Sequence, residues 1–353
     1  MIDLRSDFLS SPTPAMLDAM RTVAGHDKGY GPRDDPQQRL LEQTAADLLG
    51  KDDALFVPTC MMANLLAVMA AAKRGDAVVL DSDSHVLNGE SGALAAIAGV
   101  VTRPLPASRG RIPLEALAAC LESGTLQQPR TSVVMMENTH NRAGGVAVGA
   151  DYYADVRRCI GDRWLHLDGS RIFNAAVALA ESPAALVRSA DSVAVSLNKG
   201  LAAPAGALLA GPVDFIAEAT RLRQQLGGGW RPVGMLASAA LVGLQSMVGR
   251  LADDHRHARL LALTLARCQR VTVDLASVQT NIVRARLDCS RIEPRGFQAA
   301  LETEGVRIRI GDDGAFRLVT YVDITREMTT HVCAVLTALL SGSGTDIDEE
   351  DVQ

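Results

Sequence analysis

Short apolar runs alternate with longer amphipathic segments through the middle of the chain. The runs that indicate buried strands are 54–57, 77–80, 133–137, 164–168, 192–197 and 207–210. Segments with helical periodicity lie between them, among them 61–72, 114–122, 152–160 and 213–226. Strands that alternate with helices in this way are typical of an α/β domain with a largely parallel sheet.

The last third of the chain has a different pattern. A long helical pattern runs from about 235 to about 267, and the order strand, helix, strand, strand, helix follows at 281–287, 294–304, 306–310, 316–321 and 326–340. This order predicts a small α+β unit. We therefore expect four parts: an N-terminal arm (1–13), a large domain (14–250), a small C-terminal domain (251–340) and a disordered acidic tail (341–353). The first thirty residues are loop-like with one short helix, so we expect them to pack on a neighbour.

The composition narrows the class of protein. The chain has 353 residues, 48% of them hydrophobic, and a net charge of -6, so nothing in its charge indicates a nucleic-acid partner. No apolar run is long enough to span a membrane and no secretory signal is visible, so we expect a cytoplasmic protein. The nearest two of the six cysteines, Cys268 and Cys289, are 21 residues apart. This spacing excludes CxxC motifs, and we expect no metal site.

Lysine is rare in this sequence. Of the 35 basic residues, 31 are arginine and only Lys28, Lys51, Lys73 and Lys199 are lysine. An amine can lose its proton and form a Schiff base, whereas a guanidinium cannot. Lys199 is the lysine that directly follows a predicted buried strand, and it is therefore the candidate for such chemistry.

Polar residues follow five of the six predicted strands. They include Asp168, Lys199, His85, His140 and Arg171. Ligands of parallel α/β sheets bind beyond the carboxyl ends of the strands, so these residues describe one site. An amine for a Schiff base, a carboxylate for a pyridine nitrogen and a flat side chain over the ring are what a pyridoxal phosphate enzyme needs. The turn into the helical segment 61–72 could offer backbone N–H groups to the phosphate.

Six motifs strengthen this interpretation. They are DLRSD at 3–7, ENTHN at 137–141, HLDGSR at 166–171, KGLAAPAG at 199–206, GGGWR at 227–231 and RLVT at 317–320. In order and spacing they resemble the low-specificity L-threonine aldolases, over about residues 1–340. That family belongs to the aspartate-aminotransferase-like, fold-type-I group of pyridoxal phosphate enzymes, which also contains the β-eliminating lyases. The resemblance implies a seven-stranded sheet in the large domain and a small α+β domain.

The resemblance also implies roles around the cofactor. Lys199 would form the aldimine with pyridoxal phosphate, Asp168 would pair with the pyridine nitrogen, and His85 would stack on the ring. The phosphate would be held by the turn Thr59-Cys60-Met61 and by Arg231, the latter from the partner subunit of a homodimer or homotetramer.

A second group of residues would face the amino acid substrate. A planar guanidinium can bind a carboxylate through two parallel hydrogen bonds, so Arg171 and Arg317 would hold the substrate carboxylate, assisted by Ser6. Arg171 would also border the cofactor. The other residues expected around the substrate are Glu90, Gln127 and His140.

The sequence departs from the family around the phosphate and the β-substituent. The family's phosphate turn reads Ser/Thr-Gly-Thr, and here Cys60 replaces the glycine. An aromatic residue of the family is replaced by Gly89, and a histidine by Gln127. The residues implied for the Schiff base and for the substrate carboxylate are kept. These changes indicate retained α-carbon chemistry on an altered, bulkier side chain.

The function that we predict is therefore retro-aldol cleavage of an L-β-hydroxy-α-amino acid to glycine and an aldehyde. Two alternatives remain open at this point. One is β-elimination or an exchange reaction on a related amino acid, which would use the same lysine and aspartate. The other is an impaired, aldolase-like scaffold with a binding or regulatory role.

Overall fold

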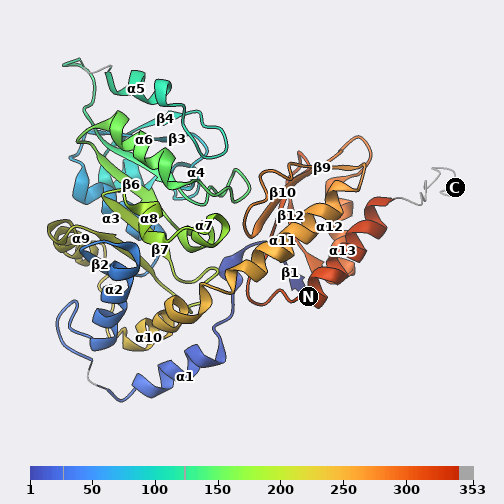
Figure 1. Cartoon of the computed structure of the whole chain (residues 1–353), viewed down its shortest axis with the longest axis horizontal. Coiled ribbons are helices and arrows are strands. Elements are labelled where there is room, and N and C mark those ends of the chain that lie inside the picture. Colours follow the sequence, from blue (N-terminus) through green and yellow to red (C-terminus); the bar gives the residue numbers. More distant parts are fainter. Residues whose placement is uncertain (27, 123–124, 342–353) are drawn as a thin grey trace.

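The computed structural model describes residues 1–26, 28–122 and 125–341, and it contains two main sheets (Figure 1). The predicted disordered tail, 341–353, lies outside the described residues except for Ser341. The large sheet has seven strands in the order β2-β8-β7-β6-β5-β3-β4. Their bounds are β2 Asp53–Val57, β3 Ala77–Asp81, β4 Val101–Leu105, β5 Thr131–Glu137, β6 Trp164–Asp168, β7 Ser192–Ser196 and β8 Ala207–Gly211.

The large sheet confirms the predicted mostly parallel arrangement. All neighbouring pairs from β7 to β4 are parallel, and only β8 runs antiparallel to both of its neighbours. The strand that the sequence did not predict is β4, at the edge of the sheet. Its residues Thr102, Arg103 and Pro104 interrupt any apolar run, and proline is tolerated at an edge because no partner needs its missing N–H.

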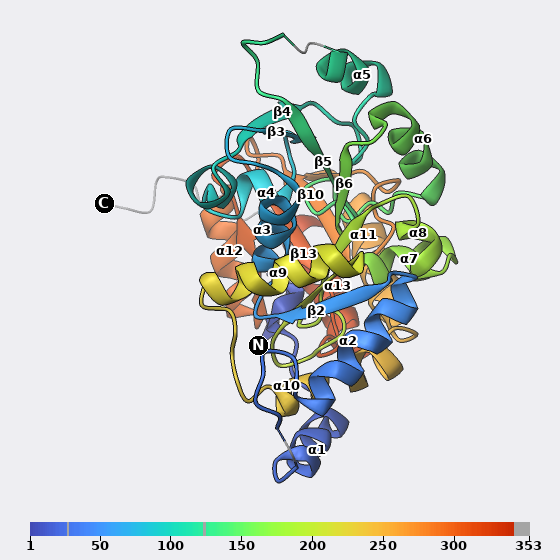
Figure 2. The ribbon, with the colours of Figure 1, turned by 90° about the vertical axis from the view of Figure 1, so that its left-hand side faces the viewer.

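Helices cover both faces of this sheet. Alternate residues of each strand point to opposite faces, so that Phe56 packs in the cluster under α2 while Leu55 packs under α3 and α9. Figure 2 shows α3 and α9 together on their face. The helices of this part are α1 Pro14–Val23, α2 Pro36–Leu49, α3 Cys60–Ala71, α4 His85–Asn88, α5 Leu114–Glu122, α6 Ala150–Ile160, α7 Ile172–Leu179, α8 Pro183–Val187, α9 Val213–Gln225 and α10 Gly234–Val242.

The long helix predicted over 235–267 is not continuous. The structure has α10, a π-helical turn at Gly243–Met247, and then α11 at Leu251–Ala266, with a bend of 68°. A π-helical turn followed by Gly249 is a common cause of such a kink. No single described helix is both long and apolar enough to span a membrane, although the bent pair meets that length and composition together.

The second sheet lies in the C-terminal part and is antiparallel, in the order β12-β13-β10-β9. Its strands are β9 Val271–Val273, β10 Ile282–Leu287, β12 Arg309–Ile310 and β13 Ala315–Val319, and the helices beside it are α11, α12 Pro294–Thr303 and α13 Arg326–Ser341. A separate hydrophobic cluster fills this part. The predicted domain boundaries at 13/14 and 250/251 stay predictions.

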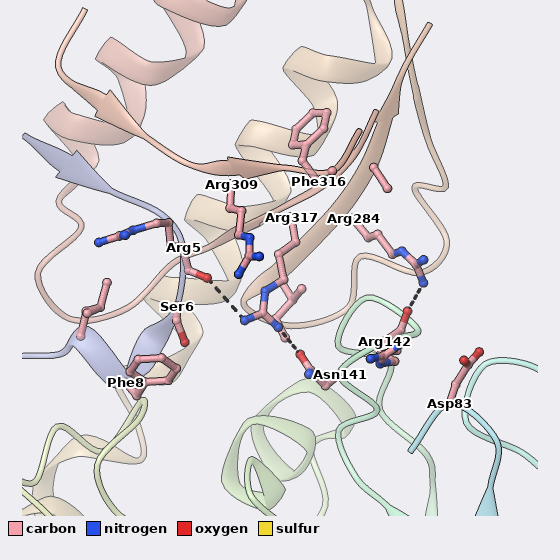
Figure 3. Close-up of a pocket in the computed structure, with 14 residues that line it drawn as sticks. Arg5, Ser6, Phe8, Asp83, Asn141, Arg142, Arg284, Arg309, Phe316 and Arg317 are labelled. Atoms are coloured by element: carbon pink, nitrogen blue, oxygen red, sulfur yellow. Dashed lines mark hydrogen bonds between the residues drawn. The ribbon is translucent and has the colours of Figure 1, made fainter. Parts of the chain in front are cut away.

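The N-terminal segment is held by its own chain. Strand β1 (Ile2–Asp3) pairs in parallel with β11 (Val306–Arg307), and Leu4 is fully buried in the C-terminal cluster. Its first residues pair with the C-terminal part of the same chain, and the expected packing of the N-terminal segment on a neighbour stays a prediction. The pairing places Ser6 on the same cavity as Arg317 of β13 (Figure 3), and Asp7 follows it in the chain.

Candidate active site

The carboxyl ends of four adjacent strands bring the predicted residues together. Strand β6 ends at Asp168 and β5 ends at Glu137, while Lys199 follows β7 and His85 follows β3. These strands lie in the order β7-β6-β5-β3, so their ends meet at one edge of the sheet. The site that the sequence predicted from strand ends is therefore assembled in space.

Asp168 is a buried carboxylate inside a hydrogen-bond network. Its Oδ1 accepts from the backbone N–H of Ser170 (3.1 Å) and from the Ser170 hydroxyl (2.8 Å), and its Oδ2 accepts from Asn64 Nδ2 (3.1 Å). Burial alone would raise the pKa of Asp168. The nearby charges of Lys199 and His85 and the Ser170 hydrogen bonds reverse that effect and keep its pKa below the ordinary value. Asp168 is therefore anionic, as a partner for a protonated pyridine nitrogen must be.

Asn64 is held in place by a second buried residue. His166 of β6 is completely buried. Its Nε2 lies 3.1 Å from Asn64 Oδ1, and its Nδ1 lies 2.8 Å from Ser192 Oγ. Burial lowers the pKa of His166 to about 4, so the ring is neutral. His166 and Asn64 thus orient Asp168 from behind. Sequence reasoning passed over Asn64, although its place one turn after Cys60 on α3 could have indicated it.

Lys199 lies in the turn after β7 and is half-buried. Within the described residues its amine has no hydrogen-bond or ion-pair partner, whereas the half-buried Lys51 amine donates to the carbonyl oxygens of Val187 and Ala190. Its charge acts on Asp168 and on Asp7, lowering the pKa of both carboxyls. Lys199 is therefore an unengaged amine close to two buried carboxylates.

His85 contacts another predicted residue, Glu90. The imidazole Nδ1 is 3.0 Å from Glu90 Oε1, and this hydrogen bond raises the pKa of His85. Gly89 lies against the ring, since a Cβ there would be 2.9 Å from His85 Nε2. His85, Glu90 and Asp168 have ligand-type atoms within 4.8 Å of one another, an arrangement that could also hold a cation. The expectation of no metal thus stays a prediction.

Glu137 positions the residues on both sides of it. It is buried, and it accepts from the backbone N–H of His85 (2.7 Å) and of Asn141 (2.8 Å). His140 forms its own contacts: its Nε2 is 2.8 Å from Asp81 Oδ2, and its Nδ1 accepts from the backbone N–H of Ala143. The structure therefore gives Glu137 and His140 positioning contacts inside the chain.

The predicted phosphate turn is the N-terminus of α3. Thr59 caps the helix through Oγ1, which accepts from Met62 N (3.1 Å), and the N–H groups of Cys60 and Met61 have no acceptor within the helix. Burial, with the negative charge of Asp168, raises the pKa of the Cys60 thiol far above its usual range, so the thiol stays protonated at neutral pH.

Arg231 and Gln127 lie apart from these groups within the chain. Arg231 is exposed and donates to the carbonyl oxygen of Tyr30 (2.5 Å). The neighbouring Gly228 packs closely against Met62 on α3, which brings the Gly-rich segment to the first turn of that helix. Gln127 is exposed in a turn between α5 and β5, and no described contact joins it to the site. Their predicted roles therefore remain predictions.

The arginines predicted to bind the substrate carboxylate lie where the two sheets face each other. Arg171 is buried and donates from Nε and Nη2 to the two oxygens of Asp7 (2.6 and 2.7 Å). Arg317 donates from Nη1 to Asn141 Oδ1 (2.6 Å) and lines a cavity of about 600 Å³ (Figure 3). Ser6 lines the same cavity, and its buried hydroxyl has no hydrogen-bond partner among the residues that the structure describes.

Asp7 is the residue at this end of the site that sequence reasoning missed. It also accepts from Asn281 Nδ2 (3.0 Å), and although burial alone would raise its pKa, Arg171 lowers that pKa to about 2. The DLRSD motif contained the signal, because an acid next to Ser6 has to be neutralised when that segment is buried.

Comparisons with known proteins agree with this geometry. Residues 3–288 match the family described as beta-eliminating lyase. The chain is 37% identical over 332 residues to low-specificity L-threonine aldolase 1 of Arabidopsis thaliana, covering 92% of each chain. It is 34% identical over 344 residues to the low specificity L-threonine aldolase of Escherichia coli (strain K12), covering 97% of this chain and 100% of that one.

Solved structures show the same fold. A threonine aldolase of Leishmania major superposes with a TM-score of 0.83 at 19% identity, covering 96% of this chain and 100% of that one. An aspartate aminotransferase from Rhodobacter sphaeroides superposes with a TM-score of 0.71 at 18% identity, covering 96% and 91%. The predicted aspartate-aminotransferase-like fold is thereby confirmed.

Proposed function

The chain belongs to the beta-eliminating lyase family, and we propose that it is a pyridoxal-phosphate-dependent aldolase that cleaves an L-β-hydroxy-α-amino acid to glycine and an aldehyde. The single observation that carries this proposal is the unpartnered, half-buried Lys199 amine beside the buried, anionic Asp168. Its relatives of this length are named for cleavage of threonine. The Ser6, Arg171 and Arg317 group supports an amino acid as the substrate class.

The residues present fit the cofactor. Lys199 would hold it covalently, Asp168 would hold its pyridine nitrogen, and the N-terminus of α3 at Thr59–Met61 would receive its phosphate. His85 would lie over the ring. When bound, the cofactor would supply an electron-accepting ring for the electron pair left on Cα. We further propose that the chain forms a homodimer or homotetramer in which the exposed Arg231 reaches the phosphate of the neighbouring subunit.

The chain's own groups account for the rest of the reaction. Arg317 and the Nη1 of Arg171 would orient the α-carboxylate, with the Ser6 hydroxyl donating to it. Glu90 occupies Nδ1 of His85 and leaves Nε2 without a described partner, so the neutral form of His85 would take the proton of the β-hydroxyl at Nε2. Loss of that proton, cleavage of the Cα–Cβ bond and protonation of Cα give the aldehyde and glycine. Lys199, once released, can supply the proton to Cα.

The test is product analysis on the purified protein loaded with pyridoxal phosphate. We expect release of glycine from L-threonine or a bulkier β-hydroxy amino acid, together with a visible absorption band of lysine-bound cofactor. Lys199→Ala should lose the band and lower glycine release on the order of 10³-fold or more. Lys73→Ala is the matched control, since Lys73 is exposed, and it should change neither.

Other products would redirect or overturn the proposal. Ammonia and an oxo acid in place of glycine would replace aldol cleavage by β-elimination. A protein that takes up no cofactor and releases none of these products would instead be a binding scaffold.

A further inference from the structure

The cavity between the two sheets is lined by a row of arginines. Arg284 of β10 is the register partner of Arg317 of β13, and Arg317 is the register partner of Arg309 of β12. Directly paired residues of antiparallel strands point to the same face of a sheet, and Figure 3 shows the three side chains reaching into the cavity. Arg142 lines the cavity from the opposite side. We call these four residues the arginine row.

The protein supplies little negative charge to balance this row. Within the described residues, the guanidinium groups of Arg142 and Arg309 have no hydrogen-bond or ion-pair partner, and Arg284 donates only to the carbonyl oxygen of Arg142. The acid that lines the cavity is Asp83. Burial and the neighbouring positive charges of Arg171 and Arg142 lower the pKa of Arg317.

Such a row costs folding stability. Like charges directly opposite each other on neighbouring strands repel. Without acidic partners among the described residues, this repulsion between the arginines is not offset in the folded state. Outside the cavity the chain pairs Arg286 with Asp313 and Arg307 with Glu302. Arg5, which lines the cavity, is paired with Asp3 and is therefore not part of the row. Of the described residues that line the cavity, the four arginines of the row thus face a single acid, Asp83, and an anionic ligand would complete the charge balance.

One carboxylate cannot occupy the whole row. The α-carboxylate of the substrate would engage Arg317 beside the unpartnered Ser6 hydroxyl, at one end of a cavity of about 600 Å³. Arg309, Arg284 and Arg142 then remain, with Phe8 and Phe316 as apolar walls that could flank a short carbon spacer. This arrangement leaves space and positive charge for a second anionic group on the substrate.

We propose that the preferred substrate is an L-β-hydroxy-α-amino acid whose β-substituent ends in a carboxylate or a phosphate, bound by Arg309, Arg284 and Arg142. The inference rests on the proposed aldol cleavage and specifies its substrate class. The reaction balances as before: the β-hydroxyl loses its proton, the Cα–Cβ bond breaks and Cα is protonated. The aldehyde product keeps the anionic group, so it is an oxo acid or a phosphorylated aldehyde.

The test compares substrates of matched shape and different charge on the holoenzyme. L-β-hydroxyaspartate is compared with L-β-hydroxyasparagine, and the 4-phosphate ester of 4-hydroxythreonine with 4-hydroxythreonine, by kcat/KM for glycine release. We expect at least about a ten-fold preference for one charged member over its neutral match, the usual gain from a charged hydrogen-bonded pair. The first pair identifies a carboxylate substrate and the second a phosphate substrate.

Variants of single arginines test which residues cause the preference for a charged substrate. Arg309→Gln and, independently, Arg284→Gln should each lower kcat/KM for the charged substrate about ten-fold more than for its neutral match. Arg307→Gln, two residues from Arg309 but paired with Glu302 outside the cavity, should leave the ratio unchanged. Because Arg284 and Arg309 are exposed, these variants are expected to fold.

The two possible failures are distinguishable. Cleavage of threonine and of the neutral substrates without any preference for charge would overturn this inference and leave the aldolase proposal intact. A preference that survives both Arg309→Gln and Arg284→Gln would also overturn it. If no compound, threonine included, releases glycine, then the proposed function itself is wrong.

Discussion

The two ends of the site treat charge in opposite ways. Around Asp168 the charged groups are buried and mutually compensated, through Lys199, His85 and the Ser170 and Asn64 hydrogen bonds. Asp7 and Arg171 form a closed pair in the same manner. In the arginine row, Arg142, Arg284 and Arg309 are exposed, Arg317 is half-buried, and the positive charges are largely uncompensated. Where buried charges compensate one another, the side chains are held in place before a ligand binds. Where the positive charges of the arginine row are uncompensated, a bound anion would supply most of the compensating charge.

The largest expected effect comes from removing one charge of the buried Asp7–Arg171 pair. Asp7→Asn would leave the buried Arg171 charge without its partner, and we expect a loss of about 3 kcal/mol in the free energy of unfolding. Asp18→Asn is the control, because the Asp18–Arg21 pair is exposed and should contribute almost nothing. Urea unfolding of both variants measures the difference, and equal losses would contradict the assignment of Asp7 as a compensating buried charge.

Acidification should remove the same charge without a mutation. The pKa of Asp7 is about 2 in the folded protein, below its ordinary 3.8. A lowered pKa contributes stability that is present above pH about 4 and is lost as the pH falls toward 2, an effect of about 2 kcal/mol. The acid limb of the stability curve should therefore be flatter in Asp7→Asn than in the wild type.

An intermediate effect is expected at Asp168. Asp168→Asn keeps the shape of the side chain and removes its charge, so we expect glycine release to fall on the order of 10²-fold while the fold is retained. Asp162→Asn, in an exposed turn before β6, is the control and should retain activity. An Asp168→Asn protein with wild-type kcat would show that the buried carboxylate does not act on the cofactor.

The smallest effect is expected in the arginine row, where removal of one uncompensated charge should change stability only slightly. Arg309→Gln removes one of two like charges opposite each other, so the free energy of unfolding should rise by about 0.5 kcal/mol in the absence of substrate. The gain should shrink at high salt, because exposed charges are screened. Arg307→Gln breaks an exposed ion pair instead, and it should lower stability slightly or leave it unchanged. A loss of stability in Arg309→Gln would mean that the row is balanced by the protein.

The sequence predicted the large sheet well because its inner strands are buried on both faces. Such strands appear as continuous apolar runs, and β6 (Trp164–Asp168) matches its prediction to the residue. The edge strand β4 and the bend between α10 and α11 were missed, since an exposed edge has no apolar run and Gly249 hardly disturbs a helical pattern.

The location of a site residue could be predicted where it depends only on the position of that residue along one strand. Lys199 and Asp168 could be found because each directly follows a buried run. The Asp7–Arg171 pair joins residues 164 positions apart, and the arginine row depends on the register of three strands, so no local pattern contains either. Pairings of this kind follow from the tertiary fold alone.

The pairing of β1 with β11 has a consequence for protein synthesis. Ile2 is made 304 residues before its partner Val306, and Asp7 is made long before Asn281. At about 5–20 residues per second, a ribosome needs on the order of 15–60 s to cover that interval. The strand ends of the large sheet can assemble during this time, but Ser6 and Asp7 cannot reach their final places. The part of the site that we propose binds the substrate is therefore completed last, and a nascent chain already contains Lys199 before Ser6 and Asp7 are in place.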